Sequence, residues 1–169
     1  KNIDDEKFKP TTGEIVAPKN AKCAIILPGE VEPIFGNESI LEHIYNKTKD
    51  EALAVEILNR MGLSDAVLYR AKYRELSTGQ KERARLASAL AERPNLLLID
   101  EFAAHLDTLT AARIAKKLAD LAREANITLI LVTHRREIIK ALRPDKIVFV
   151  GYGITRVARP EEYRTLLEE

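Results

Sequence analysis

The sequence predicts an α/β protein built on a parallel β-sheet. Short apolar runs alternate with amphipathic helical stretches in the second half of the chain. Those runs are almost continuously apolar, which is typical of parallel strands covered by helices on both faces of a sheet. The length of 169 residues fits one domain, with room for a small subdomain.

Composition excludes several other classes. An apolar fraction of 46% with 31% charged residues excludes a disordered chain. The 27 basic and 26 acidic residues nearly cancel, so no overall charge favours nucleic acid or an anionic membrane. No apolar run reaches the roughly 18 residues that span a bilayer. A single cysteine excludes an internal disulfide, and we expect a soluble protein of a reducing compartment.

The first half of the chain begins with strand signals and continues as helices. Short apolar runs at 13–16 and 24–27 are bounded by glycine or proline and predict strands. Two prolines and two glycines make 28–37 a loop. From 39 to 71 the apolar residues recur at helical spacing, and Gly62 ends one of the helices.

The second half of the chain alternates strand and helix. Strands are predicted at 96–99, 127–132 and 146–150, and helices at 111–122, at 135–142 and from Pro160 onward. The glycines around Tyr152 predict a turn into an edge hairpin that ends near Ala158.

Acidic and imidazole side chains follow two of these strands. Asp100 and Glu101 come directly after 96–99, and His134 follows 127–132. Parallel strands end at the same edge of a sheet, which is where ligands of open α/β sheets bind. One carboxylate there can hold Mg²⁺ and the other can orient or deprotonate a water. Taken singly, the two acids also fit solvated loop positions, and Asp107 also fits a helix cap.

A second candidate site lies at the start of a helix that runs to about Glu92. Ser77 is a good N-cap, and Gln80 stands three residues later, as in a capping box. The same start, with its free N–H groups, a hydroxyl and Gly79, also suits a bound phosphate.

Taken together, these motifs resemble the nucleotide-binding domain of ABC-type ATPases over almost the whole chain. Residues 76–80 resemble the family signature, and 96–101 resemble its Walker B strand with the catalytic glutamate. Residues 104–107 resemble the D-loop, and His134 resembles the H-loop histidine.

The resemblance implies ATP and Mg²⁺ as cofactors. Asp100 would hold Mg²⁺, Glu101 would polarise the attacking water, and His134 would orient that water and contact the γ-phosphate. It also implies a head-to-tail dimer with a second ABC-type domain, in which Asp107 communicates across the interface. The residues that would contact the partner's nucleotide are Ser77, Thr78, Gly79 and Gln80. The implied location is cytoplasmic, without membrane insertion, next to a coupled domain or membrane subunit.

One family motif is absent. The sequence contains no Gly-x-x-x-x-Gly-Lys-[Ser/Thr] loop, and 29–39 echoes it only faintly. We therefore expect the phosphate loop to lie upstream of residue 1, on a central strand of the sheet that this chain lacks.

Other positions also depart from the family pattern. Gln80 is the only glutamine, so the Q-loop glutamine is missing, and Glu30 or Glu32 either replaces it or is a solvated loop acid. Thr78 replaces a usual glycine, and Phe102 replaces a usual proline. These departures resemble the subfamily fused to an acetyltransferase-like domain.

Two arginines follow His134. Arg135 and Arg136 fit a surface pair at a helix start better than a contact with the γ-phosphate.

We therefore predict an ATP-hydrolysing ABC-type module with an α/β core at 1–36 and 77–169 and a helical subdomain at 37–76. One alternative is a soluble ABC-type ATPase associated with nucleic acid or the ribosome. The other is a regulatory or binding module that does not hydrolyse ATP. The missing phosphate loop favours the second alternative, and the retained acids, histidine and signature weigh against it.

Overall fold

The chain folds around a three-stranded parallel sheet, as predicted. The computed structural model describes residues 12–14, 16, 18–28 and 35–163. The strands are β1 (Cys23–Ile26), β2 (Leu96–Ile99) and β3 (Thr128–Leu131), and their order in the sheet is β1-β2-β3. They pair in parallel and without offset, so Ile26, Ile99 and Leu131 lie side by side where the strands end.

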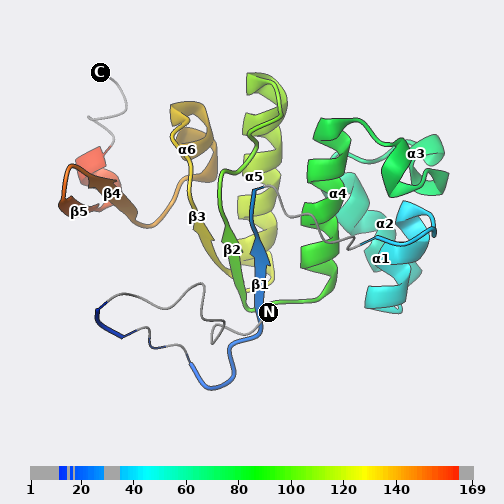
Figure 1. Cartoon of the computed structure of the whole chain (residues 1–169), viewed down its shortest axis with the longest axis horizontal. Coiled ribbons are helices and arrows are strands. Elements are labelled where there is room, and N and C mark those ends of the chain that lie inside the picture. The colour runs from blue at the N-terminus through cyan, green and yellow to red at the C-terminus, as the bar shows by residue number, and fades with distance from the viewer. Residues whose placement is uncertain (1–11, 15, 17, 29–34, 164–169) are drawn as a thin grey trace.

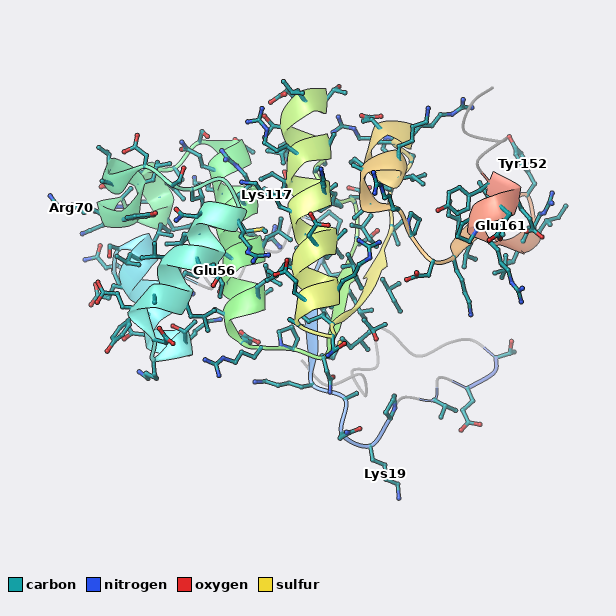
Figure 2. All side chains as sticks on the ribbon, turned by 180° about the vertical axis from the view of Figure 1, so that it is seen from behind. Lys19, Glu56, Arg70, Lys117, Tyr152 and Glu161 are labelled. Atoms are coloured by element: carbon teal, nitrogen blue, oxygen red, sulfur yellow. The ribbon has the colours of Figure 1, made fainter. Side chains whose placement is uncertain are left out.

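Long helices cover one face of this sheet. They are α4 (Thr78–Ala91) and α5 (Thr108–Glu124), and the shorter α6 (Arg136–Leu142) packs against α5. Helix α5 lies behind the sheet in Figure 1 and in front of it in the reverse view of Figure 2. On the covered face Ala24, Leu97 and Ile99 are buried, while on the other face Ile130 is 54% exposed. The prediction of helices on both faces is therefore wrong for the described residues.

Helices also fill the segment between β1 and α4, as the apolar spacing predicted. They are α1 (Ile40–Thr48), α2 (Glu51–Arg60) and α3 (Ala66–Arg70), followed by a 3-10 turn at Tyr73–Glu75. Gly62 follows α2 with a φ of +73°, a backbone conformation that favours glycine. Helices α1 and α2 pack on α4 through a shared apolar core, and α3 packs on α1, to the right of the sheet in Figure 1. The division into a core and a helical subdomain at 37–76 stays a prediction.

Two strand predictions need correction. The strand predicted at 146–150 is β4 (Ile147–Gly151), which pairs antiparallel with β5 (Ile154–Ala158) and forms a separate two-stranded sheet. Figure 1 shows this hairpin beyond α6, apart from the parallel sheet. The hairpin that the glycines around Tyr152 predict is thus confirmed, and only the expected place of this strand in the parallel sheet is wrong.

The other correction concerns 13–16. Gly13, Glu14 and Val16 lie outside any strand, and Ile15 is outside the described residues. Val16 is 82% exposed, so its side chain is not packed as it would be on the buried face of a sheet.

No helix among the described residues is both long and apolar enough to cross a bilayer.

Candidate functional site

The predicted site begins where the parallel strands end. The backbone N–H of Asp100 donates to the carbonyl of Ile26 at 3.0 Å, and that of Val132 donates to Ile99 at 2.8 Å. The N–H of Phe102 then donates to Val132 at 3.3 Å. This ladder continues the sheet by one residue and brings Asp100 and Glu101 to its carboxyl edge, as predicted.

The turn that carries Glu101 has an uncommon backbone. Glu101 has a φ of +51° and Ala103 a φ of +62°, both in the left-handed region. Such conformations cost free energy for residues other than glycine and persist where the surroundings enforce them. The side chains of Phe102 and Ala103 are buried, so their packing holds the turn, while Glu101 stays exposed to solvent.

A cleft of about 190 Å³ joins the strand edge to the start of α4. Asp100 and Glu101 line it from the strand side, and Thr78 lines it from the helix. Lys81 and Arg85, also on α4, add positive charge to the same cleft. The structure therefore brings together two sequence motifs that lie about 20 residues apart.

The start of α4 is a capping box, as predicted. The Ser77 hydroxyl accepts a hydrogen bond from the N–H of Gln80 at 3.3 Å, and the Gln80 side chain accepts one from the N–H of Ser77 at 2.9 Å. Ser77 and Thr78 are exposed, and Gly79 is half-buried. Gln80 thus has a structural role, while Ser77 and Thr78 remain accessible to a ligand at the positive end of the helix.

Asp107 begins the next helix. Its carboxylate accepts a hydrogen bond from the N–H of Thr110 at 2.9 Å and so caps α5. Hydrogen bonds from Thr110 hold the pKa of Asp107 below its usual range. The helix-cap interpretation is therefore confirmed, and a role in communication across a dimer stays a prediction.

His134 follows β3 and is exposed. It lies on the same sheet edge as Asp100 but does not line the cleft. The next residue, Arg135, has more contacts with the site than His134 has. Arg135 is not the surface residue that the sequence suggested, because its side chain is only 17% exposed and bonds to the loop after Glu101.

A magnesium ion fits the donor chemistry of Asp100. No group of three acidic, histidine or cysteine side chains among the described residues could hold a metal by itself. Magnesium is commonly held by one or two carboxylates, with substrate phosphates and waters completing its shell. A half-buried carboxylate on a cleft edge matches that pattern. Glu30 and Glu32 lie outside the described residues.

Sequence reasoning missed one further contact of the site. The Glu82 carboxylate on α4 accepts a hydrogen bond from the backbone N–H of His105 at 3.3 Å and ties the loop after Glu101 to the helix. No local pattern signals it, because the acceptor is one of many acidic residues on helix surfaces and the donor is a backbone amide.

The sequence model of the ABC transporter family matches residues 5–104, which is more than half of the chain. The match contains 77–80, Asp100 and Glu101, and it ends before Asp107 and His134.

Curated proteins that resemble this chain are named as ATP-binding proteins of methionine import. The methionine import ATP-binding protein MetN 2 of Pseudomonas aeruginosa is 38% identical over 111 residues, which are 65% of this chain and 32% of that protein. MetN 1 of Pseudomonas fluorescens is 39% identical over 100 residues, 59% of this chain and 29% of that protein. The chain thus spans about a third of the length of these relatives.

Solved structures share the fold. CbiO1 of Clostridium perfringens, part of an ABC transporter complex, superposes with a TM-score of 0.65 at 24% identity and covers 85% of this chain and 59% of that one. A dimeric ATP-binding cassette bound to ADP and Pi gives a TM-score of 0.66 at 24% identity and covers 83% of this chain and 63% of that one. Together with the family match, these similarities show that the chain belongs to the ABC transporter family, as an ABC-type ATPase nucleotide-binding domain.

Proposed function

We propose that this chain binds and hydrolyses ATP with Mg²⁺ as part of a composite site shared with a second ABC-type domain. The observation that carries the proposal is that Asp100 and Glu101 line an incomplete cleft at the carboxyl edge of the sheet, while Ser77 and Thr78 at the start of α4 are exposed and accessible to a second domain. Carboxylates at a strand end suit metal binding and water activation, and a helix N-terminus suits an anion.

Each residue has a distinct role in this proposal. Asp100 would hold Mg²⁺, which neutralises phosphate charge when bound. The exposed Glu101 carboxylate accepts a proton from the attacking water, and His134 orients that water. Ser77, Thr78 and Gly79 donate backbone or hydroxyl hydrogen bonds to the γ-phosphate of a nucleotide held by the second domain.

The size and charge of the cleft support a shared site. Its volume of about 190 Å³ is below the roughly 300–1,000 Å³ of a complete small-molecule pocket. The carboxylates of Glu82, Asp100 and Glu101, which line the cleft, also repel a triphosphate unless cations offset them. Lys81 and Arg85 supply some positive charge, but the sequence has no phosphate-binding loop to surround the β- and γ-phosphates.

We infer that the missing loop arrives on a further strand that pairs with β3. Within the described residues β3 pairs only with β2, and β4 pairs only with β5. Ile130 and Val132 are 54% and 57% exposed at β3, and Val150 is 79% exposed at β4. An unpaired strand edge with exposed apolar side chains is a ready template for another strand. This supports the expectation that the phosphate loop lies on a sheet strand outside the 169 residues.

The relatives suggest what the ATPase serves. Their names describe ATP-binding proteins for methionine import. We propose that this chain likewise couples ATP hydrolysis to a membrane subunit from the cytoplasmic side. A second prediction is that the coupled partner is an acetyltransferase-like domain fused to this chain, because Thr78 and Phe102 depart from the usual family residues.

Complementation between two inactive variants tests the composite site. In the protein that joins this chain to a phosphate-binding loop, Glu101→Gln damages the hydrolytic face and Ser77→Arg damages the signature face. In a head-to-tail dimer, a mixed pair contains one site with both faces intact. Mixing equal amounts should restore about a quarter of wild-type phosphate release, because half of the random pairs are mixed and each keeps one of two sites.

The control is the summed activity of the separate variants. Activity that does not rise above this sum on mixing would contradict a shared site. A wild-type protein that binds ATP without releasing phosphate would instead favour the non-hydrolysing regulatory module.

A further inference from the structure

Arg135 connects the end of β3 to the loop that begins at Glu101. Its Nη1 atom donates to the carbonyl of Ala103 at 2.8 Å and to that of Leu106 at 3.1 Å. Its Nη2 atom lies 3.5 Å from the hydroxyl of Thr108, in the first turn of α5. One guanidinium group therefore spans the loop 101–107 from its first turn to the helix that follows it.

The guanidinium itself is held in place. Its Nε atom donates to the Glu137 carboxylate at 2.7 Å. The pKa of Glu137 lies below its usual range, first because its carboxylate bonds to its own backbone N–H and second because of this bond from Arg135. The Arg135 side chain is 17% exposed, so these bonds are largely shielded from water. A planar, always charged fork anchored at one end is well suited to fix two carbonyls at once.

The loop that Arg135 holds carries strain next to the candidate base. Glu101 and Ala103 have left-handed backbones, and the Ala103 carbonyl that receives Arg135 also accepts the N–H of Leu106 at 3.2 Å. Releasing the carbonyls of Ala103 and Leu106 would allow this turn to relax. Because Glu101 lies two residues before Ala103, such relaxation would move its carboxylate.

We propose that Arg135 is a positioning residue that fixes the Glu101 carboxylate relative to His134, the residue that precedes Arg135 in the chain. The inference rests on the proposed ATPase function, in which both side chains act on the same water. Arg135 touches neither nucleotide nor water in this role and acts through the loop backbone. Neighbouring Arg136 is exposed and provides a matched control.

Steady-state kinetics test the proposal in the protein that joins this chain to a phosphate-binding loop. Arg135→Ala should lower kcat by about 10- to 100-fold, the usual cost of a displaced catalytic group, with KM for ATP within threefold of wild type. Arg135→Lys keeps the charge but not the fork and should lie between the two. Arg136→Ala should match wild type. Rates are measured well below the melting temperature of each variant and per folded protein.

A double-mutant cycle separates positioning from a general loss of stability. If Arg135 acts through Glu101, Arg135→Ala should lower the residual single-turnover rate of Glu101→Gln by less than twofold. Equal fold losses in both backgrounds would overturn the proposal, as would an Arg135→Ala kcat within twofold of wild type. An inactive wild-type protein would overturn the proposed function itself.

Amide exchange in the 169-residue chain supplies a readout that needs no hydrolysis. Arg135→Ala should speed hydrogen exchange at the Leu106 N–H, which donates to the Ala103 carbonyl. Exchange at the Thr110 N–H, which donates to the Asp107 carboxylate, should not change. Unchanged exchange at Leu106 would contradict the hold of Arg135 on the loop, whatever the ATPase result.

Discussion

Gly79 and Leu106 lie in direct contact across the interface between α4 and the loop after β2. A Cβ atom on Gly79 would lie 2.9 Å from Cδ2 of Leu106 and 3.5 Å from the carbonyl oxygen of His105. The candidate signature glycine therefore lets the helix start approach the loop that carries the candidate base. The closeness of the two motifs depends on a missing side chain.

Enlarging Gly79 should separate these elements. Gly79→Ala should change the free energy of unfolding by less than about 1 kcal/mol, because higher helix propensity offsets a contact with one flexible methyl group. Gly79→Val should cost about 1–3 kcal/mol through overpacking. Urea unfolding measures both, with Lys116→Val on the exposed face of α5 as a control for β-branching. A valine variant as stable as the alanine variant would contradict the contact.

Removing the Glu101 carboxylate should stop hydrolysis and spare binding. In the protein with a phosphate-binding loop, Glu101→Gln should lower steady-state phosphate release by about 10²–10⁴-fold, the usual contribution of a positioned base. ATP binding should persist, because glutamine has the same shape and one negative charge fewer. Glu161→Gln, at an exposed position, is the control. Release within threefold of wild type would rule out Glu101 as the base.

Ser77→Arg should block ATP-driven dimerisation measured by light scattering in the Glu101→Gln background. Arginine places bulk and positive charge at the positive end of α4, where the partner's nucleotide is proposed to bind. Because Ser77 also caps the helix, Ser77→Ala is the necessary control, with a cost of about 1 kcal/mol from the lost cap and no added bulk. If Ser77→Ala blocks dimerisation as completely as Ser77→Arg does, then the lost helix cap explains the effect and the proposed interface does not.

The 169-residue chain by itself should bind Mg·ATP weakly. Its cleft offers three carboxylates, two nearby cations and one helix start, without a phosphate-binding loop. We expect a dissociation constant on the order of 1 mM or weaker, which corresponds to about 4 kcal/mol or less. Isothermal titration calorimetry measures it. Micromolar binding would mean that another segment, such as 29–39, is a working phosphate loop.

Acid should destabilise the chain through His43. The Nδ1 atom of this buried histidine lies 2.7 Å from the Glu38 carboxylate, which can only accept, and its Nε2 atom lies 2.9 Å from the Ser88 hydroxyl, so a neutral ring is satisfied at both nitrogens. Burial lowers the pKa of His43 below its ordinary 6.5, more than Glu38 raises it. The unfolded chain therefore binds the proton first, and stability that is full above pH 6.5 falls as pH falls below it.

Variants of two histidines, one buried and one exposed, separate this effect. His43→Gln should flatten the pH dependence of the unfolding free energy between pH 6.5 and 5, and His105→Gln, with a 66% exposed side chain, should not. Glu38 adds a second acid-sensitive step, because its hydrogen bond with His43 lowers its pKa from 4.5 to about 2. The stability that Glu38 adds is present above pH 4.5 and is lost toward pH 2. Equal slopes for His43→Gln and wild type would refute the role of His43.

The sequence alone determined the elements whose signals are local. Helix caps join residues two to four positions apart, so Ser77, Asp107 and Gly62 could be assigned from spacing alone, and the structure confirms all three. Apolar period and run length likewise located the strands at 24–27, 96–99 and 127–132 to within one residue at each end. The place of Asp100 and Glu101 at the carboxyl edge of the sheet was also predictable, because both directly follow one of these strands and parallel strands end at the same edge.

Tertiary structure alone decided the contacts between distant residues. The strand at 147–151 has the same apolar pattern as its predecessors, yet among the described residues it lies outside their sheet and pairs only in the hairpin that the local glycines predict. Which sheet an apolar strand joins depends on which strand edge is within reach. The guanidinium of Arg135 reaches carbonyls 29 and 32 residues away, and a surface pair of arginines at a helix start has the same sequence pattern. Periodicity reports which face of an element is apolar. Only packing determines what that face meets, because such contacts arise between residues that share no local spacing.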